Sequence, residues 1–143
     1  MMPGRELIER LVPHAGAMCL LDAVTGWDAT SIACSAAAPG TSHPLARDGA
    51  VPSIAAAEYA AQATALHGAL IDQAGGPRAG ALAKLVDVEL CRPHLRAGSA
   101  VSVRADMLGR LATGCMYGFE VSDGQEAIAR GRLIVAFEPE AAA

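Results

Sequence analysis

The chain has 143 residues, of which 52% are hydrophobic but only 3% aromatic, and its formal net charge is −4 at pH 7. This length fits one compact domain, residues 1–143, and the negative charge argues against general nucleic-acid binding. No apolar stretch reaches the roughly 18 uncharged residues of a membrane span. The first ten residues also lack the apolar core of a secretory signal, so we expect a cytoplasmic protein.

Four segments are predicted in the first third of the chain. Apolar residues recur at helical spacing over residues 5–11, which predicts a short amphipathic helix. Two strand-like runs follow at residues 22–27 and 31–37, joined by a short turn. Residues 39–50 are rich in Gly, Pro, Ser and Asp, a composition that is typical of a loop.

One long helix is predicted next. Pro52 suits the first helical position, where its missing N–H would have no intrahelical acceptor in any case. The helical pattern continues to about residue 74 and ends at the run Gly-Gly-Pro at residues 75–77, a strong stop.

After the helix the hydrophobic period changes to two. Val101, Val103 and Ala105 alternate with polar residues, which indicates a strand with one buried face. Four such strands are predicted, at residues 81–91, 100–108, 114–121 and 127–137. One long helix wrapped by an antiparallel sheet gives a layered α+β domain.

The cysteines do not form a recognisable metal or redox motif. No Cys-x-x-Cys pair and no zinc-finger spacing occurs among Cys19, Cys34, Cys91 and Cys115. We interpret them as reduced thiols, mostly buried, and expect neither a metal nor an organic cofactor.

Two titratable residues stand out as candidates for proton transfer. Glu58 lies inside an alanine-rich helix that otherwise carries few charges, and His43 lies in the loop before that helix. A buried carboxylate is costly unless it is paired or functional, and histidine titrates near neutrality. The pair therefore suggests acid/base catalysis. A structural acid paired with an arginine and an ordinary loop histidine are the alternatives.

Three segments together resemble the hot-dog fold β-hydroxyacyl-acyl carrier protein dehydratases. They are the Pro-His loop before the Leu-x-Asp-x-Val pattern of residues 20–24, the loop histidine His43, and Pro52 followed by Glu-Tyr-Ala-Ala-Gln-Ala at residues 58–63. The run His-Pro-Leu at residues 43–45 resembles a predicted subgroup of these dehydratases that is associated with specialised acyl chains as well as ordinary fatty acids. The resemblance implies a hot-dog fold over essentially the whole chain.

The resemblance also implies a reaction, the dehydration of a 3-hydroxyacyl thioester to a trans-2-enoyl thioester. His43 would remove the C2 proton and Glu58 would protonate the departing hydroxyl. Backbone N–H groups around Ser53 and Ile54 at the helix start would stabilise the thioester oxygen, because helix N-termini favour negative charge. Gln62, one turn beyond Glu58, would orient the acid by hydrogen bonding.

Acyl carrier protein is the partner that the resemblance implies, together with a homodimer in which His43 faces Glu58 of the partner subunit. Arg92 and Arg96 flank a turn that could form a basic patch for the acidic carrier or for its phosphopantetheine phosphate. A solvated turn is the alternative for these two arginines and for His94 between them.

Two remaining histidines are not assigned to catalysis. His14 is interpreted as a packing or capping residue, and its role stays open. His67 lies nine residues past Glu58, about half a turn out of phase, and is expected to be structural.

Two other functions remain open at this stage. A hot-dog acyl thioesterase is one, because that fold hosts both activities. A non-catalytic subunit that completes a hot-dog heterodimer is the other. The histidine at position 43 favours the dehydratase over the thioesterase.

Overall fold

The computed structural model describes residues 4–11, 18–40, 42–72, 80–124 and 126–137. In chain order the elements are α1 (Arg5–Leu11), β1 (Ala23–Trp27), β2 (Ser31–Ala36), the 3-10 helix η2 (Ser53–Ala55), α2 (Ala56–Asp72), β3 (Gly80–Leu90), β4 (Val101–Leu111), β5 (Gly114–Asp123) and β6 (Glu126–Phe137). The Pro-His loop that contains His14 and the predicted helix stop at residues 75–77 lie outside the described residues.

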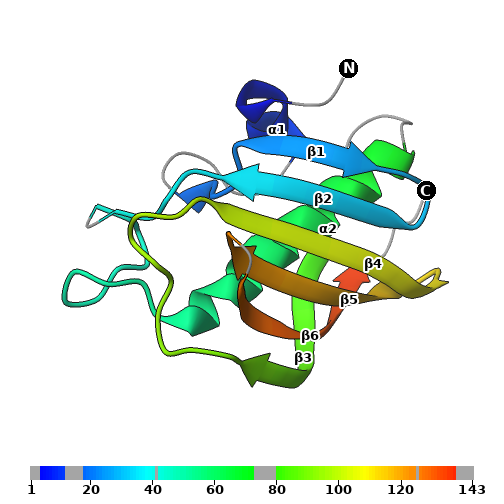
Figure 1. Ribbon diagram of the computed structural model, residues 1–143. Helices are drawn as coiled ribbons and strands as arrows, with labels where there is room; N and C mark the ends of the chain where they lie inside the picture. Colours follow the sequence, from blue (N-terminus) through cyan, green and yellow to red (C-terminus); the bar gives the residue numbers. More distant parts are fainter. Residues whose placement is uncertain (1–3, 12–17, 41, 73–79, 125, 138–143) are drawn as a thin grey trace.

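The strands form one antiparallel sheet in the order β1-β2-β4-β5-β6-β3. Figure 1 shows α2 crossing one face of this curved sheet, with α1 beside β1. The predicted α+β arrangement of one long helix on an antiparallel sheet is therefore confirmed. No helix in the described part of the chain is long and apolar enough to cross a membrane.

Small side chains let α2 lie close to the sheet. Ala56, Ala60 and Ala63 are fully buried, and Leu66 fills the same interface further along the helix. Alanine has no side-chain rotamers to lose on burial, so a close helix–sheet contact made from alanine costs little conformational entropy. The low aromatic content of the chain matches this kind of core.

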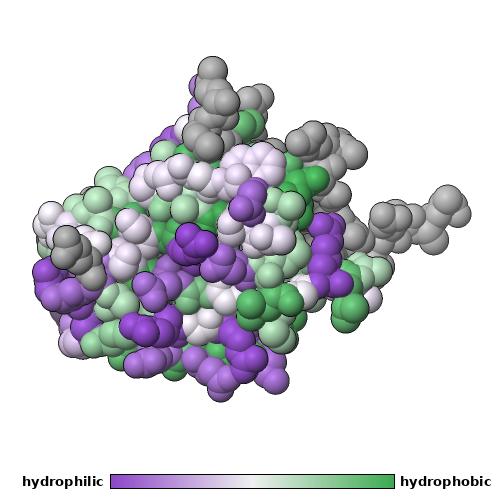
Figure 2. Space-filling model, turned by 45° about the vertical axis from the view of Figure 1, so that its right-hand side comes forward, coloured by the Kyte–Doolittle hydropathy of each residue, from purple (hydrophilic) through white to green (hydrophobic). Residues whose placement is uncertain are grey.

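The alternation of β4 follows the predicted period of two. Val101, Val103 and Ala105 are buried, whereas Ser102 and Arg104 between them are exposed. One face of the strand therefore packs towards the core and the other meets solvent. On the molecular face shown in Figure 2, hydrophilic and hydrophobic residues are interspersed.

The start of the long helix differs from the prediction at Pro52. Pro52 is the N-cap, with an extended backbone at φ −61° and ψ 145°, and the first turn, Ser53–Ala55, is a 3-10 helix. The difference arises because Pro52 forms a β-bridge with His94, and Ser53 N–H donates to the carbonyl oxygen of Pro93 at 2.9 Å. These contacts hold the chain extended until the helix begins.

The loop before η2 contains a tight turn that the sequence analysis did not identify. Arg47 and Ala50 exchange backbone hydrogen bonds of 2.7 and 3.1 Å, and φ is positive at Asp48 (53°) and Gly49 (81°). Positive φ at both central residues is the mark of a type I′ turn, for which Asp-Gly is a preferred pair. The loop therefore reaches the helix start through a defined hairpin.

A charged cluster ties α1 to the sheet. Arg5 Nη1 donates to Asp22 Oδ1 at 2.6 Å, and its Nη2 donates to the carbonyl oxygen of Cys19 at 2.7 Å. The other carboxylate oxygen of Asp22 accepts the backbone N–H of Ala37 at 2.6 Å. The Leu-x-Asp-x-Val pattern therefore uses its aspartate to join α1, the start of β1 and the end of β2.

Candidate active site

A cleft of about 560 Å³ lies between the loop after His43 and the start of the long helix. Its lining combines apolar side chains with one acid, Glu58, and one base, Arg47. The full lining is Pro44, Leu45, Ala46, Arg47, Pro52, Ile54, Ala55, Ala57 and Glu58. The predicted catalytic acid and the segment that follows the predicted catalytic histidine therefore share one cleft.

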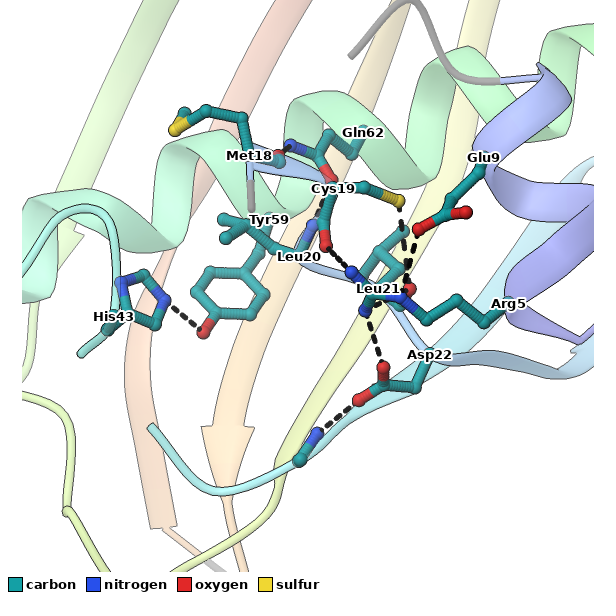
Figure 3. Close-up of polar contacts among 11 residues, drawn as sticks. Arg5, Glu9, Met18, Cys19, Leu20, Leu21, Asp22, His43, Tyr59 and Gln62 are labelled. Atoms are coloured by element: carbon teal, nitrogen blue, oxygen red, sulfur yellow. Dashed lines mark hydrogen bonds and ion pairs between the residues drawn. The ribbon is translucent and has the colours of Figure 1, made fainter. Parts of the chain in front are cut away.

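Glu58 is half-buried in the single chain and is held by a neighbouring amide. Gln62, which is 1% exposed, donates from Nε2 to Glu58 Oε1 at 2.9 Å. Gln62 Nε2 also donates to the carbonyl oxygen of Met18 at 2.6 Å, and its Oε1 accepts the N–H of Leu20 at 2.8 Å. The amide of Gln62 therefore links the carboxylate of Glu58 to the segment before β1. Figure 3 shows the bonds of this amide to Met18 and Leu20.

His43 is half-buried and has a hydrogen-bond partner on each ring nitrogen. The backbone N–H of Leu45 donates to His43 Nδ1 at 3.0 Å, and His43 Nε2 lies 3.0 Å from the hydroxyl oxygen of Tyr59. A backbone N–H can only donate, so Nδ1 is the accepting nitrogen. The proton of the neutral ring therefore sits on Nε2 and points at Tyr59, as Figure 3 shows for the two side chains.

Burial determines the protonation of both members of this pair. Desolvation lowers the pKa of His43 below its ordinary value of 6.5, so the imidazole is mainly neutral at pH 7. Desolvation, with a smaller contribution from the charge of Asp22, raises the pKa of Tyr59 to about 12. His43 can therefore accept a proton at neutral pH, and Tyr59 stays a neutral phenol.

The two predicted oxyanion donors differ in what their backbone N–H groups do. The N–H of Ser53 already donates to Pro93, and the hydroxyl oxygen of Ser53 is buried without a hydrogen-bond partner among the described residues. Ile54 lies in the first turn, where a backbone N–H has no intrahelical acceptor, and its side chain is 52% exposed in the cleft. Ile54 is therefore the better placed of the two donors.

The charges of Arg92 and Arg96 are compensated by nearby acids. Arg92 pairs with the buried carboxylate of Asp123 at 3.0 Å and also with Glu126. Arg96 pairs with Glu126 at 2.8 Å. This turn is consequently not a strongly basic patch.

Arg47 is the cation of the cleft, and sequence reasoning did not single it out. The residue is exposed and lines the cleft, and its guanidinium forms no ion pair with the residues that the structure describes. Its position, three residues before the end of the predicted loop and five before Pro52, was visible in the sequence. What the sequence could not show is that Arg92 and Arg96 have acidic partners, whereas Arg47 has none among the described residues.

His67 is fully buried and has a structural role. Its Nε2 lies 2.8 Å from the carbonyl oxygen of Asp28, which can only accept, so Nδ1 accepts the hydroxyl of Tyr117 at 2.7 Å. Desolvation is the main cause that lowers the pKa of His67. The described residues contain no group of His, Cys, Asp and Glu side chains that could hold a metal ion.

The arrangement is suited to moving protons at an acyl chain. It places a neutral imidazole, a carboxyl group and an available helix N–H around or beside an apolar cleft. These are the groups that a base, an acid and an oxyanion stabiliser require.

Comparisons with known proteins agree on one fold. A family model described as ApeP-like, ApeP dehydratase, matches residues 6–143. No curated protein matches the chain in a sequence search. A structure of the dehydratase heterocomplex ApeI:P from Xenorhabdus doucetiae matches with a TM-score of 0.82 and 22% identity over 93% of this chain and 91% of that chain.

Two further solved structures are similar at lower identity. A mutant of the thioesterase PA1618 from Pseudomonas aeruginosa matches with a TM-score of 0.69 and 15% identity over 94% of this chain and 93% of that chain. AziG from S. sahachiroi matches with a TM-score of 0.66 and 15% identity over 90% of this chain and 98% of that chain. At these identities the matches establish the fold, the predicted hot-dog fold.

Proposed function

The chain belongs to the ApeP-like dehydratase family, and from this membership we propose that it dehydrates 3-hydroxyacyl thioesters carried on acyl carrier protein. The product is the trans-2-enoyl thioester, formed in the synthesis of a fatty or specialised acyl chain. The observation that carries the proposal is the cleft that Glu58 shares with the loop of His43. Its apolar lining suits an acyl chain, and its few polar groups suit proton transfer.

In the proposed mechanism His43 removes the C2 proton and Glu58 delivers a proton to the C3 hydroxyl. The electron pair of the C2–H bond becomes the second bond between C2 and C3, and the hydroxyl leaves as water. The lowered pKa of His43 supports the first role, because the imidazole is neutral at working pH. After each turnover the imidazolium and the carboxylate return to their starting forms by exchanging a proton through solvent.

Two neighbouring groups complete the proposed site. The N–H of Ile54 stabilises negative charge on the thioester oxygen, with Ser53 contributing only if its bond to Pro93 opens. Gln62 orients Glu58 through its 2.9 Å hydrogen bond. Neither role requires a metal or an organic cofactor.

We assign the carrier contact to Arg47 rather than to Arg92 and Arg96. The phosphopantetheine arm carries a phosphate, and the carrier surface is acidic, so both favour a guanidinium at the mouth of the cleft. Arg47 lines that cleft, whereas the two other arginines are paired with Asp123 and Glu126.

The proposed working form contains a second hot-dog subunit. β3 is an edge strand of the described sheet, so its outer hydrogen-bonding groups are available to another sheet. A homodimer with His43 facing the partner subunit's Glu58 is one arrangement. The ApeI:P structure, itself named a heterocomplex, supports the alternative that the second subunit is a different chain.

The test is the interconversion of 3-hydroxyacyl and 2-enoyl thioesters on acyl carrier protein, with the purified chain alone and with a co-purified hot-dog partner. Wild type should turn over, and His43→Ala and Glu58→Gln should each lose about 100-fold or more in rate, the usual contribution of a general acid/base residue.

Free thiol release, measured in the same samples, detects hydrolysis. Hydrolysis that survives His43→Ala would favour a thioesterase. If a mixed complex in which this chain carries His43→Ala and the partner is wild type kept full activity, this chain would be the non-catalytic partner.

A further inference from the structure

The cleft has two walls, and residues 51–53 form the junction between them. Loop residues 44–47 form one wall, and the start of the long helix up to Glu58 forms the other. Val51 is 3% exposed and Ser53 is 1% exposed, so the junction is packed into the protein interior. The position of the junction therefore sets how the two walls lie relative to each other.

The junction is hydrogen-bonded to the turn at residues 92–96. The carbonyl oxygen of Val51 accepts the N–H of Leu95 at 3.0 Å, and the N–H of Ser53 donates to the carbonyl oxygen of Pro93 at 2.9 Å. These two bonds flank a single antiparallel β-bridge. No residue of the turn is among those that line the cleft, so the turn can act on the walls only through the junction.

A buried carboxylate at the end of β5 holds the turn in turn. The side chain of Asp123 is 0% exposed, and its Oδ2 accepts from Arg92 Nη1 at 3.0 Å. The same oxygen accepts the backbone N–H of Arg96 at 3.3 Å. Asp123 thus bonds to both ends of the turn, and a charge-assisted hydrogen bond in a buried place is stronger than a neutral one.

We propose that Asp123 is a positioning residue, which acts through Arg92 and the 92–96 turn to set the relative position of the two walls of the cleft. This rests on the proposed function and adds to it a residue that lies outside the cleft. The helix wall carries Glu58 and the N–H of Ile54, which must reach a substrate that the loop wall also contacts. A misplacement of about 1 Å caused by a remote change can cost about 100-fold in rate.

The first experiment separates positioning from charge compensation. Arg92→Met leaves Asp123 as an uncompensated buried charge, whose Oδ1 already has no hydrogen-bond partner among the described residues, so the urea midpoint should fall. Arg92→Met combined with Asp123→Leu removes that charge, so the midpoint should recover. The kcat of the double variant should nevertheless stay about tenfold low, as for a shift smaller than 1 Å, because the turn has lost its attachment. Recovery of kcat together with the midpoint would overturn the proposal.

Glu126 supplies the matched control, because it pairs with the same two arginines from the surface and is 61% exposed. Glu126→Gln should keep wild-type kcat and KM, since exposed ion pairs contribute little. Asp123→Leu should lower kcat about tenfold with KM nearly unchanged. A rise in KM at unchanged kcat would overturn the proposal and return Arg92 to the carrier contact.

The second experiment is amide hydrogen exchange followed by NMR, which needs no activity. The N–H groups of Ser53 and Leu95 report whether the junction stays bonded to the turn. In Asp123→Leu both should exchange about tenfold faster relative to Val103 in the central strand β4, which serves as the reference for global unfolding. Equal acceleration at all three sites would overturn the proposal. Because this result does not depend on turnover, it is distinguishable from a failure of the proposed function.

Discussion

Gln62 donates to Glu58 across one helical turn, and the same amide bonds to the backbone on both sides of Cys19. The carboxylate in the cleft is thereby linked to the segment that leads into β1. Because Gln62 is almost completely buried, none of these bonds can be replaced easily by water.

Replacing Gln62 with Leu should affect both stability and turnover. Leu20 N–H and the Met18 carbonyl lose their buried partner, so the free energy of unfolding should fall by about 1–3 kcal/mol. Glu58 loses its amide donor, so kcat should fall more than KM changes. Thr64→Val is the control, because among the described residues the Thr64 hydroxyl bonds to the carbonyl oxygen of Ala61 in its own helix and to no other group. Urea unfolding measures the change in stability, and steady-state kinetics measure the change in turnover. An unchanged kcat would contradict the orienting role of Gln62.

Stability should decrease as the pH is lowered below about 6.5, partly because of His67. Burial lowers the pKa of His67 in the folded state, so the unfolded chain, with a value of about 6.5, takes up the proton first. The unfolded state therefore binds more protons between the lowered pKa and 6.5, and the free energy of unfolding rises with pH in that window. His67→Gln should flatten this dependence in urea titrations at pH 5 to 8. An equally steep profile in the variant would assign the pH dependence to other groups, among which His43 has a pKa shifted in the same direction.

Arg47→Ala should weaken use of the carrier-bound substrate while leaving the chemical step intact. The expected result is a rise in KM of about tenfold on acyl carrier protein, since a charge-assisted contact to phosphate or carboxylate is lost. The effect should shrink as salt is raised, because exposed charges are screened. Arg104→Ala is the control, since Arg104 is exposed on β4 and is not part of the cleft. A fall in kcat at constant KM would contradict the carrier assignment.

Asp22→Ala should destabilise the fold more than Glu9→Ala, although both acids bond to Arg5. Asp22 also accepts the N–H of Ala37, so its loss breaks two short hydrogen bonds that include a charged group. We expect about 1.5–3 kcal/mol for Asp22. We expect no more than about 0.5 kcal/mol for Glu9, whose pair with Arg5 is exposed and within one helix. Equal losses in chemical unfolding would contradict the proposed link between α1 and the sheet.

The strands could be predicted from the sequence because buried residues alternate with less buried ones at the start of β4 and along most of β5. The long helix could be predicted from its alanine-rich run, which begins shortly after Pro52. β4 and β5 extend beyond their predicted ends, to Leu111 and Asp123, because pairing between the two strands continues past the apolar residues. The Asp48-Gly49 turn was available as a local signal, but it lies within a segment whose composition indicated an irregular loop.

Long-range partners explain most of what the sequence did not reveal about the site. The acids that pair with Arg92 and Arg96 lie about thirty residues away in the chain. The sequence therefore showed the two arginines of the turn but not the carboxylates that compensate their charge. Tyr59 was recognised only as part of a motif beside Glu58. Its hydroxyl is hydrogen-bonded to His43, which lies sixteen residues earlier in the chain, and only the folded loop brings the two side chains together.

Trp27, the one tryptophan in the sequence, is the last residue of β1. It is not among the residues that line the cleft. The fluorescence of Trp27 should therefore change when the edge of the sheet unfolds. It should change little when an acyl chain binds in the cleft. Stability can thus be monitored optically in the presence of substrate. A tryptophan introduced at Ile54, whose side chain is exposed in the cleft, would provide the missing reporter of occupancy.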